Sequence, residues 1–418
     1  MGSIAVVGAG LSGLRCATLL QASGHDVQVY ERSSRLGGRM QTDQKDGFLL
    51  DHGFHVMQTG YPASKRTFNF QTLGAQAFEP GAILVEQRKK RAKFWTMADP
   101  FRRPLQGVFS GLNRFASPLD LLRVAMMRFA VRRGNVNKTF EGGMDDTRAY
   151  LMQRGFSERM IDRFFHPLFS GIFLEDDLRT NERMFRFVFR MMSEGQMVLP
   201  EEGVAAAPKQ LAQRLGYDRI HLDSTIEIHD ATSLSVNGKK MKFDAIVKAY
   251  NPHLNQEKRH VWTVHYGAPS SPLKSKHILL NTDVRLKNGL IAHLAVPSDI
   301  QPSYAPAGKS LVSVTVVGQR AEALGLQDAS AIEGTVRAEL SNWFGSQTAD
   351  WDLLDVQHIR HALPEVGANL ELTSTSRNNG FECGDHTVHG SVEGALVSAE
   401  QVANAVHEHL ERRVHGLD

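Results

Sequence analysis

The pattern of apolar and polar positions is clearest at the start of the chain. A short β-branched run at 4–7 is followed by a glycine-rich segment, and residues 14–22 then have the apolar spacing of a helix. A second strand-like run follows at 26–31. This order predicts a βαβ unit with two parallel strands, which is the beginning of a doubly wound α/β sheet.

Further along, segments with helical spacing alternate with segments typical of strands. Long helical segments rich in Phe, Met and Arg extend from about residue 79 to residue 194, and short strands return over 220–250. Asn237-Gly238 predicts a hairpin turn there. The expected strands are 48–50, 220–222, 226–228, 234–236, 243–247 and 310–317, and the expected helices are 119–131, 184–192, 331–343 and 392–410.

The glycine-rich segment after the first strand is Gly8-Ala9-Gly10-Leu11-Ser12-Gly13. Glycine at these positions permits a tight turn, a close approach of the backbone to a pyrophosphate, and close packing of the helix, whose first amides face the phosphates. Glu31, at the end of the second strand, suits the hydroxyls of a ribose and repels the 2′-phosphate of NADP. The predicted dinucleotide-binding residues are Gly8, Gly10, Leu11, Ser12, Gly13 and Glu31. An ordinary glycine-rich turn without a ligand is the alternative.

The chain of 418 residues is long enough for two domains, because a single core stops growing at roughly 250–300 residues. The fold class is predicted as α/β: a Rossmann-like nucleotide-binding domain with an inserted, mixed α+β substrate domain. The nucleotide-binding domain is expected at 1–78, 195–261 and 356–418, and the inserted domain at 79–194 and 262–355.

A basic, glycine-containing run, Arg32 to Arg39, follows Glu31 directly. Its three arginines suit phosphate oxygens, and the pair Gly37-Gly38 would let backbone amides approach a flat ring. A solvated basic loop is the alternative interpretation.

Composition narrows the class of protein. Hydrophobic residues make up 42% and charged residues 22%, which is ordinary for a globular protein and excludes a mostly disordered chain. No apolar run approaches the roughly 20 residues of a membrane span, and the N-terminus lacks the pattern of a secretory signal, so a cytoplasmic location is expected. A net charge of +3 does not indicate nucleic-acid binding. The two cysteines, Cys16 and Cys383, lack metal-ligand spacing, and no metal site is expected.

Two motifs near the C-terminus, Cys383-Gly384-Asp385 and Ser391-Val392-Glu393-Gly394-Ala395, complete a pattern. With Gly8 to Gly13, Glu31 and the Arg32–Arg39 run, they resemble the flavin-containing amine oxidase superfamily, which includes monoamine oxidases, protoporphyrinogen oxidases and carotenoid desaturases. The resemblance implies an extended FAD, with its ADP on the N-terminal unit and its isoalloxazine directed toward the inserted domain.

The resemblance also implies particular contacts. Asp385 would hydrogen-bond the ribityl or pyrophosphate region, the turn at 392–395 would place amides near the pyrimidine edge of the flavin, and Ile226 matches a position whose backbone contacts the adenine. A helix starting near Val392 would independently stabilise negative charge on a reduced flavin. The further cofactor contacts implied are Arg32, Gly37, Gly38, Arg39, Gly53, Phe54, His55, Ile226, Gly384, Asp385, Ser391, Val392 and Ala395.

Covalently flavinylated relatives carry a cysteine shortly before the late motif, where this chain has 376–380 without one. Cys383 is expected to pack as a small buried apolar group instead. FAD is therefore expected to be held non-covalently.

The segment Asp51 to Gln58, with Tyr61-Pro62, is similar to a segment of plant-type carotene desaturases that would lie along the flavin. His55 is the candidate general base, because histidine titrates near neutral pH. A hydrogen-bonded structural histidine is the alternative among the 18 histidines of the chain.

Aromatic and apolar residues gather at 164–173 and 184–192. They could line a tunnel for a polyene or a tetrapyrrole, or they could be core. The leading hypothesis is an FAD-dependent oxidase or desaturase of a hydrophobic substrate. One alternative is amine oxidation, whose enzymes usually have an aromatic pair facing the flavin and a lysine near it. Lys276 is a candidate for that lysine, whereas the sequence does not place Trp351 and Tyr304 in a cage. The other is a prenyl-binding escort protein of the same fold that lacks active flavin.

The stretch 88–138 is strongly basic and interleaved with aromatic residues. Such a stretch could rest on anionic lipid at a membrane surface, or it could be an ordinary solvated face. Its basic residues are Arg88, Lys89, Lys90, Arg91, Lys93, Arg102, Arg103, Arg114, Arg123, Arg128, Arg132, Arg133 and Lys138.

Overall fold

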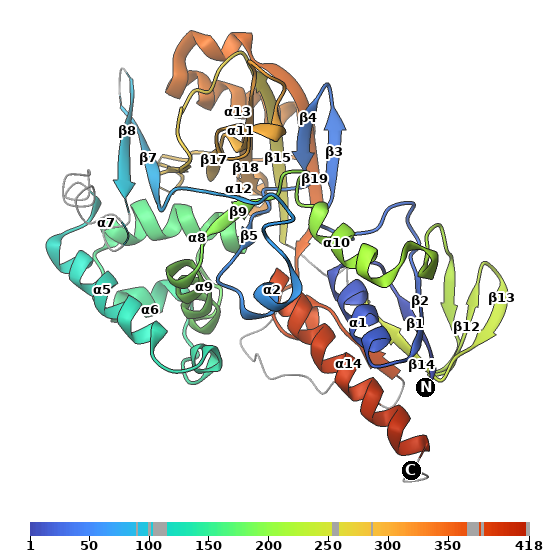
Figure 1. Cartoon of the computed structure of the whole chain (residues 1–418). Coiled ribbons are helices and arrows are strands. Elements are labelled where there is room, and N and C mark those ends of the chain that lie inside the picture. The colour runs from blue at the N-terminus through green and yellow to red at the C-terminus, as the bar shows by residue number, and fades with distance from the viewer. Residues whose placement is uncertain are drawn as a thin grey trace.

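The computed structural model describes residues 1–88, 91–98, 102, 115–252, 259–285, 287–365, 376–377 and 380–414. Figure 1 shows a sheet near the N-terminus, a second sheet beyond it, and a group of helices beside the second sheet. The Rossmann-like domain and the inserted α+β domain are therefore confirmed as the two parts of the fold.

The first sheet has six strands in the order β10-β2-β1-β14-β21-β20. All neighbours are parallel except β20 and β21. Its strands are β1 (Ser3–Val7), β2 (Asp26–Tyr30), β10 (Ile220–His221), β14 (Ala245–Lys248), β20 (Ser376–Arg377) and β21 (Gly380–Glu382). Segments from the beginning, middle and end of the chain thus share one sheet.

Alternate residues of each strand point to opposite faces of this sheet, and helices cover one of the two faces. Ile4 and Val6 of β1 pack into a core with α1 (Leu11–Ala22), α10 (Ala206–Leu215) and α14 (Val392–Val414). Ala5 and Val7 point to the other face. There an antiparallel sheet of β11 (Ile226–Ile228), β12 (Ser233–Val236) and β13 (Lys239–Lys242) covers them in place of helices.

The predicted hairpin turn between β12 and β13 is confirmed. Asn237 and Gly238 have φ values of 49° and 81°, and Val236 pairs with Lys239 across the turn. Two consecutive positive φ values are those of a type I′ turn, which Asn-Gly favours.

The second sheet has seven strands in the order β19-β15-β18-β17-β16-β7-β8, antiparallel except for the pair β16 and β7. Its strands are β7 (Gly81–Gln87), β8 (Ala92–Ala98), β15 (Arg259–Ala268), β16 (Ile278–Asn281), β17 (His293–Ala295), β18 (Ser310–Val317) and β19 (Asp352–Leu363). Ile83 and Val85 pack toward α13 (Ala329–Phe344), while Ala82 and Leu84 face the helices on the other side.

Those helices belong to the inserted domain. They are α5 (Pro118–Arg132), α6 (Thr147–Gln153), α7 (Glu158–Met160), α8 (His166–Phe173) and α9 (Glu182–Glu194), with a π-helical turn at Ile161–Phe165. Ser117 and Asp120 form a capping box that begins α5, and Asn181 caps α9. None of the helices in the described ranges is long and apolar enough to cross a membrane.

Smaller elements join the two sheets. A hairpin of β3 (Thr42–Lys45) and β4 (Phe48–Asp51) lies near a three-stranded sheet of β5 (Met57–Gln58), β9 (Met197–Leu199) and β6 (Gln76–Ala77). The remaining short helices and turns are α2 (Pro62–Thr67), Val136–Phe140, Tyr217–Arg219, α11 (Pro297–Ile300), Pro302–Tyr304, α12 (Gly318–Ala323), Gly345–Asp350 and Asp385–Thr387.

Two segments differ from the sequence-based expectation. The segment at 79–194, expected to be helical, begins with the paired strands β7 and β8. Residues 356–363, expected in the nucleotide-binding domain, continue β19 of the second sheet, where they pair with β15. In both cases, hydrogen bonds to strands far away in the chain place the segment in the second sheet. The pattern of residues within one strand does not show which strand it pairs with.

Candidate functional site

The glycine turn between β1 and α1 leaves no room for side chains at two of its glycines. Gly8 has a φ of 113°, and a Cβ there would lie 2.8 Å from the carbonyl oxygen of Ala249. A Cβ on Gly13 would lie 1.9 Å from the carbonyl oxygen of Gly8. Gly10 is the N-cap of α1, and no side chain caps it. The first amides of α1, from Leu11, Ser12 and Gly13, therefore begin the helix without a capping side chain, as an anion site at a helix N-terminus requires.

The run after Glu31 folds back onto this turn. The amide of Gly37 donates to the carbonyl of Ala9 over 2.7 Å, and a Cβ on Gly38 would lie 3.3 Å from the Cα of Gly10. The Glu31 carboxylate accepts hydrogen bonds from the amides of Ala9, at 2.8 Å, and Ser33, at 2.9 Å. Arg32, in contrast, is exposed. The backbones of Gly10 and Gly38 thus face each other without side chains between them. We refer to the space between them as the cradle, and a Cβ on either residue would narrow it.

Arg39 connects this cradle to the C-terminal motif. Its guanidinium forms an ion pair of 2.6 Å with Asp385 and donates to the carbonyl of Ala362 over 2.9 Å. Gly384, with a φ of 157°, donates its amide to Ser398 of α14 over 2.9 Å. The glycine turn and the late motif, more than 370 residues apart in the chain, therefore meet through Gly38, Arg39 and Asp385.

The start of α14 is held against the loop before α2. Ser391 accepts the amide of Gly394 at 3.0 Å, and its hydroxyl contacts Nδ1 of His389 at 3.0 Å. The buried Glu393 carboxylate accepts the amide of Ala63 at 2.9 Å. Burial raises the pKa of Glu393. Val392 is half-buried and Ala395 is buried at the first turn of α14. Glu393 thus links the start of α14 to the start of α2. Apart from its place in the 391–395 motif, nothing in the sequence indicated this role.

Ile226 lies beside the end of β2. It pairs with Val236 and packs with the cluster that contains Tyr30. The amide of Ser224, two residues earlier, donates to the carbonyl of Glu31 over 2.9 Å. The structure therefore brings Ile226 to the same edge of the sheet as Glu31.

The segment 53–55 contacts the second sheet. Gly53, with a φ of 75°, donates its amide to Gln357 at 3.3 Å, and the Phe54 ring packs edge-on against Phe78 and His293. Nδ1 of His55 is buried and has no hydrogen-bond partner among the described residues. Burial lowers the pKa of His55 to about 4. A buried nitrogen without a partner fits a site that a bound polar group completes.

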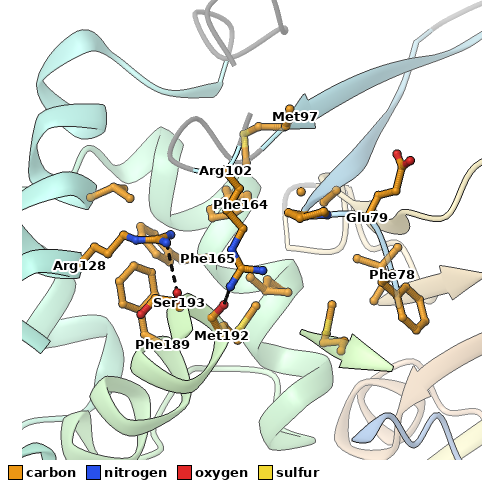
Figure 2. A pocket seen from close by; sticks show the side chains of 18 of the residues that line it. Phe78, Glu79, Met97, Arg102, Arg128, Phe164, Phe165, Phe189, Met192 and Ser193 are labelled. Carbon is orange, nitrogen blue, oxygen red and sulfur yellow. Dashed lines mark hydrogen bonds between the residues drawn. The ribbon is translucent and has the colours of Figure 1, made fainter. Parts of the chain in front are cut away.

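A cavity of about 170 Å³ lies next to this segment, between β7, β8 and the helices (Figure 2). Phe78, whose ring contacts Phe54, forms one wall, and Gln58 of β5 forms another. The π-helical turn contributes Phe164 and Phe165, as expected of a helix irregularity at a functional site. Its large apolar lining residues are Phe78, Met97, Leu121, Val124, Met160, Phe164, Phe165, Leu168, Phe169, Phe189, Met192, Met197 and Ile278.

Two arginines stand among the apolar residues of the cavity (Figure 2). Arg102 donates to the carbonyls of Met192, at 2.8 Å, and Gly195, at 2.6 Å. Arg128 donates to the carbonyl of Ser193 over 3.1 Å. Both guanidiniums therefore satisfy carbonyls at the C-terminal end of α9, where a helix dipole favours cations.

The two aromatic residues considered for amine oxidation belong to different core clusters. Trp351 packs against Phe344 and Tyr266 in the core of the second sheet, and Tyr304 donates to the buried carboxylate of Asp51 over 2.7 Å. Neither belongs to the described lining of the cavity. Lys276 precedes β16, and its carbonyl accepts the amide of Glu79. Trp351 and Tyr304 therefore do not form an aromatic cage at the cavity.

Cys383 is fully buried in the core of the first domain, as predicted. Its thiol lies beside that of Cys16, and this contact, together with burial, raises the pKa of Cys383. The stretch 376–380 contains no cysteine, and residues 378 and 379 lie outside the described residues.

The sequence profile described as "Flavin containing amine oxidoreductase" matches residues 11–407. The match covers nearly the whole chain and confirms the resemblance that the two terminal motifs indicated.

Among curated proteins, the chain is similar to 4,4'-diapophytoene desaturases (4,4'-diaponeurosporene-forming). It is 26% identical over 193 residues to the protein of Staphylococcus haemolyticus, an alignment that covers 44% of this chain and 34% of that protein. A segment of 50 residues is 46% identical to the Staphylococcus aureus protein, covering 12% of this chain and 10% of that one. The alignments thus span about a third or less of these relatives.

Solved structures share the fold along the whole chain. An oxidoreductase from Methanosarcina mazei matches with a TM-score of 0.73 and 17% identity, covering 96% of this chain and 100% of that one. Putrescine oxidase bound to putrescine matches with a TM-score of 0.71 and 14% identity, covering 97% and 98%. Cyclohexylamine oxidase from Brevibacterium oxydans has a TM-score of 0.71 and 16% identity, covering 98% and 100%.

Proposed function

Since the chain belongs to the flavin-containing amine oxidoreductase family and is an FAD-dependent oxidoreductase, we propose that it oxidises or desaturates a hydrophobic organic substrate, either a polyene or a tetrapyrrole-like molecule. The observation that carries this proposal is the apolar cavity next to Phe54. A mostly apolar pocket with a few polar groups at one end is typical of a site for a hydrophobic small molecule.

The size of the cavity refines the expectation. An engineered protein cavity of about 150 Å³ holds one benzene molecule. At about 170 Å³, this cavity encloses a group of about ring size, so a longer substrate would extend beyond it. The enclosed part would be the reacting part, because Phe78 and Gln58 join the cavity to the segment 53–58.

FAD, when bound, supplies a two-electron acceptor that takes a hydride from an activated C–H bond. The residues that would hold it are those at the cradle: Gly10 and Gly38 admit the pyrophosphate, the first amides of α1 attract its charge, and Glu31 receives the ribose hydroxyls. Asp385 would hold the ribityl or pyrophosphate region, and the first turn of α14 would hold the pyrimidine edge of the flavin. The apolar walls of the cavity would exclude water from the reacting carbon.

Non-covalent FAD predicts a specific spectrum. The purified protein should show oxidised-flavin absorbance, and acid or heat precipitation should leave the flavin in the supernatant, because no cysteine stands at 376–380 to form a thioether. A yellow precipitate would show a covalent link. A colourless protein that FAD does not reconstitute would favour the non-catalytic binding protein and contradict the proposal.

The substrate class can be tested by anaerobic bleaching of the flavin. We expect polyenes or porphyrinogens to reduce the flavin, while amines such as putrescine do not, because the described lining of the cavity is mostly apolar and includes neither Trp351 nor Tyr304. Bleaching by amines alone would replace the proposed substrate class with amines.

His55 is expected to act without titrating in the working pH range. With its pKa lowered to about 4, the ring is already neutral throughout pH 5–8, so no step in flavin reduction should appear near the ordinary histidine value of about 6.5. His55→Gln should slow reduction by less than about tenfold, whereas loss of a general base costs about 10²–10⁴-fold. A step near pH 6.5 that disappears in His55→Gln would instead establish His55 as the base.

A further inference from the structure

Helix α5 exposes four large apolar side chains on one face. Leu119 is 60% exposed, Leu122 55%, Met126 55% and Phe129 66%. Their spacing of three, four and three residues places them in one stripe along the helix. Figure 1 shows α5 at the outer edge of the helical group. We refer to these four residues as the α5 stripe.

Basic side chains accompany the α5 stripe. Arg132 and Arg133 are exposed at its C-terminal end, and the Arg133 guanidinium lies 5.3 Å from the centre of the Phe129 ring. The one carboxylate in the sequence of α5, Asp120, is buried and hydrogen-bonded to Ser117 and Ser157. The outward face of α5 is thus apolar and cationic, with its acid turned inward.

The opposite face of the same helix lines the cavity. Leu121, Val124 and Arg128 alternate with the α5 stripe and all three contribute to the cavity wall. Because an α-helix with its side chains is about 10–12 Å across, only one helix diameter separates the cavity from the outer face of α5.

We propose that the α5 stripe, with Arg132 and Arg133, docks on the surface of an anionic lipid bilayer. A helix with apolar side chains on its outer face and arginines beside them lies in the interfacial plane of a membrane, with its cations at the lipid phosphates. Docking there places a lipid-dissolved molecule next to the helix that walls the cavity. The inference goes beyond the proposed function and does not depend on the identity of the substrate.

The docking surface is narrower than the basic stretch expected from the sequence at 88–138. Arg102 and Arg128 point inward to the carbonyls at the end of α9. Lys89, Lys90, Arg103 and Arg114 lie outside the described residues.

Vesicle co-sedimentation of the full-length, FAD-loaded protein tests the proposal. We expect binding to phosphatidylcholine vesicles that contain phosphatidylglycerol, at least about tenfold weaker binding to pure phosphatidylcholine, and weaker binding in high salt. The double variant Leu122→Ser/Phe129→Ser should bind at least about tenfold more weakly. The matched control, Tyr217→Ser/Leu353→Ser, removes two other exposed apolar side chains and should bind normally.

A second pair of variants tests the charge. Arg132→Glu/Arg133→Glu should abolish the preference for anionic vesicles, whereas Lys239→Glu/Lys240→Glu on the exposed β13 hairpin should preserve it. All four double variants change exposed side chains, so flavin content and melting temperature should stay those of the parent.

Two results would overturn the proposal. One is vesicle binding that neither lipid charge, salt nor the α5 variants alter. The other is a sedimentation-velocity experiment in which the parent is a dimer and Leu122→Ser/Phe129→Ser is a monomer, since the α5 stripe would then be an interface between two copies. Neither measurement requires turnover, so both can succeed or fail independently of the proposed oxidation.

Discussion

Replacing Gly10 with valine is expected to give a folded protein that no longer retains FAD. A Cβ at Gly10 would meet only the Cα of Gly38, at the ordinary contact distance of 3.9 Å, and the backbone φ of −78° is available to any residue. The protein itself therefore tolerates the side chain. The added methyl groups occupy the cradle where the backbone must approach the pyrophosphate, so FAD affinity should fall at least about a hundredfold, which is about 2.7 kcal/mol.

The measurement is the ratio of flavin to protein absorbance after gel filtration, followed by titration of the apoprotein with FAD. Gly334→Ala is the matched control, because a Cβ there meets nothing within 4 Å on helix α13, and it should retain full flavin. Gly13→Ala should lose both flavin and stability, since its Cβ would lie 1.9 Å from the Gly8 oxygen. A Gly10→Val protein with unchanged FAD affinity would remove the glycine turn from the cofactor site.

Replacing Leu121 with tryptophan is expected to reduce substrate oxidation about a hundredfold, or about 2.7 kcal/mol in the activation barrier, while FAD remains bound. Leu121 lies on the inner face of α5 and lines a cavity of about 170 Å³. An indole adds enough volume to occupy much of that space, so the reacting part of the substrate no longer enters. FAD is unaffected because α5 contributes no residue to the cradle.

The measurement is the rate of anaerobic flavin bleaching by the substrate that the spectroscopic screen selects. Leu353→Trp, on the exposed side of β19, introduces the same side chain at a surface position and should react as the parent does. Because overpacking a core costs about 1–3 kcal/mol, melting temperature is measured for both variants. A stable Leu121→Trp protein with an unchanged rate would mean that the substrate reacts elsewhere.

Much of the nucleotide-binding domain could be predicted from local pattern. The βαβ unit and the Asn237-Gly238 turn appear where the spacing indicated them, as does strand 310–317 of the inserted domain, and α1 begins three residues earlier than expected, at Leu11. These elements are set by short-range rules: glycine φ values, side-chain alternation and helix spacing. The strand β7 was missed because Ala82 to Val85 are all apolar. Both of its faces are buried, so the alternation that marks a half-exposed strand is absent.

The motifs of the candidate site could be predicted from the sequence, but the way in which they meet in space could not. The residues at each end of the chain indicated a dinucleotide and a flavin, but their meeting through Arg39 and Asp385 depends on β21 pairing with β14. Glu393, which anchors α14 to Ala63, gave no separate signal, because its partner is a backbone amide 330 residues away.

By itself, then, the sequence determined the chemistry that depends on neighbouring residues: a glycine turn that can hold a pyrophosphate, an acidic strand end, and the family to which the chain belongs. Only the tertiary structure decided what depends on packing between distant segments. It placed a cavity between β7, β8 and the helices, turned Arg102 and Arg128 inward, and left the α5 stripe outward. The physical reason is that backbone conformation follows from local sterics, whereas an empty volume or an exposed face exists only after all the surrounding elements have packed.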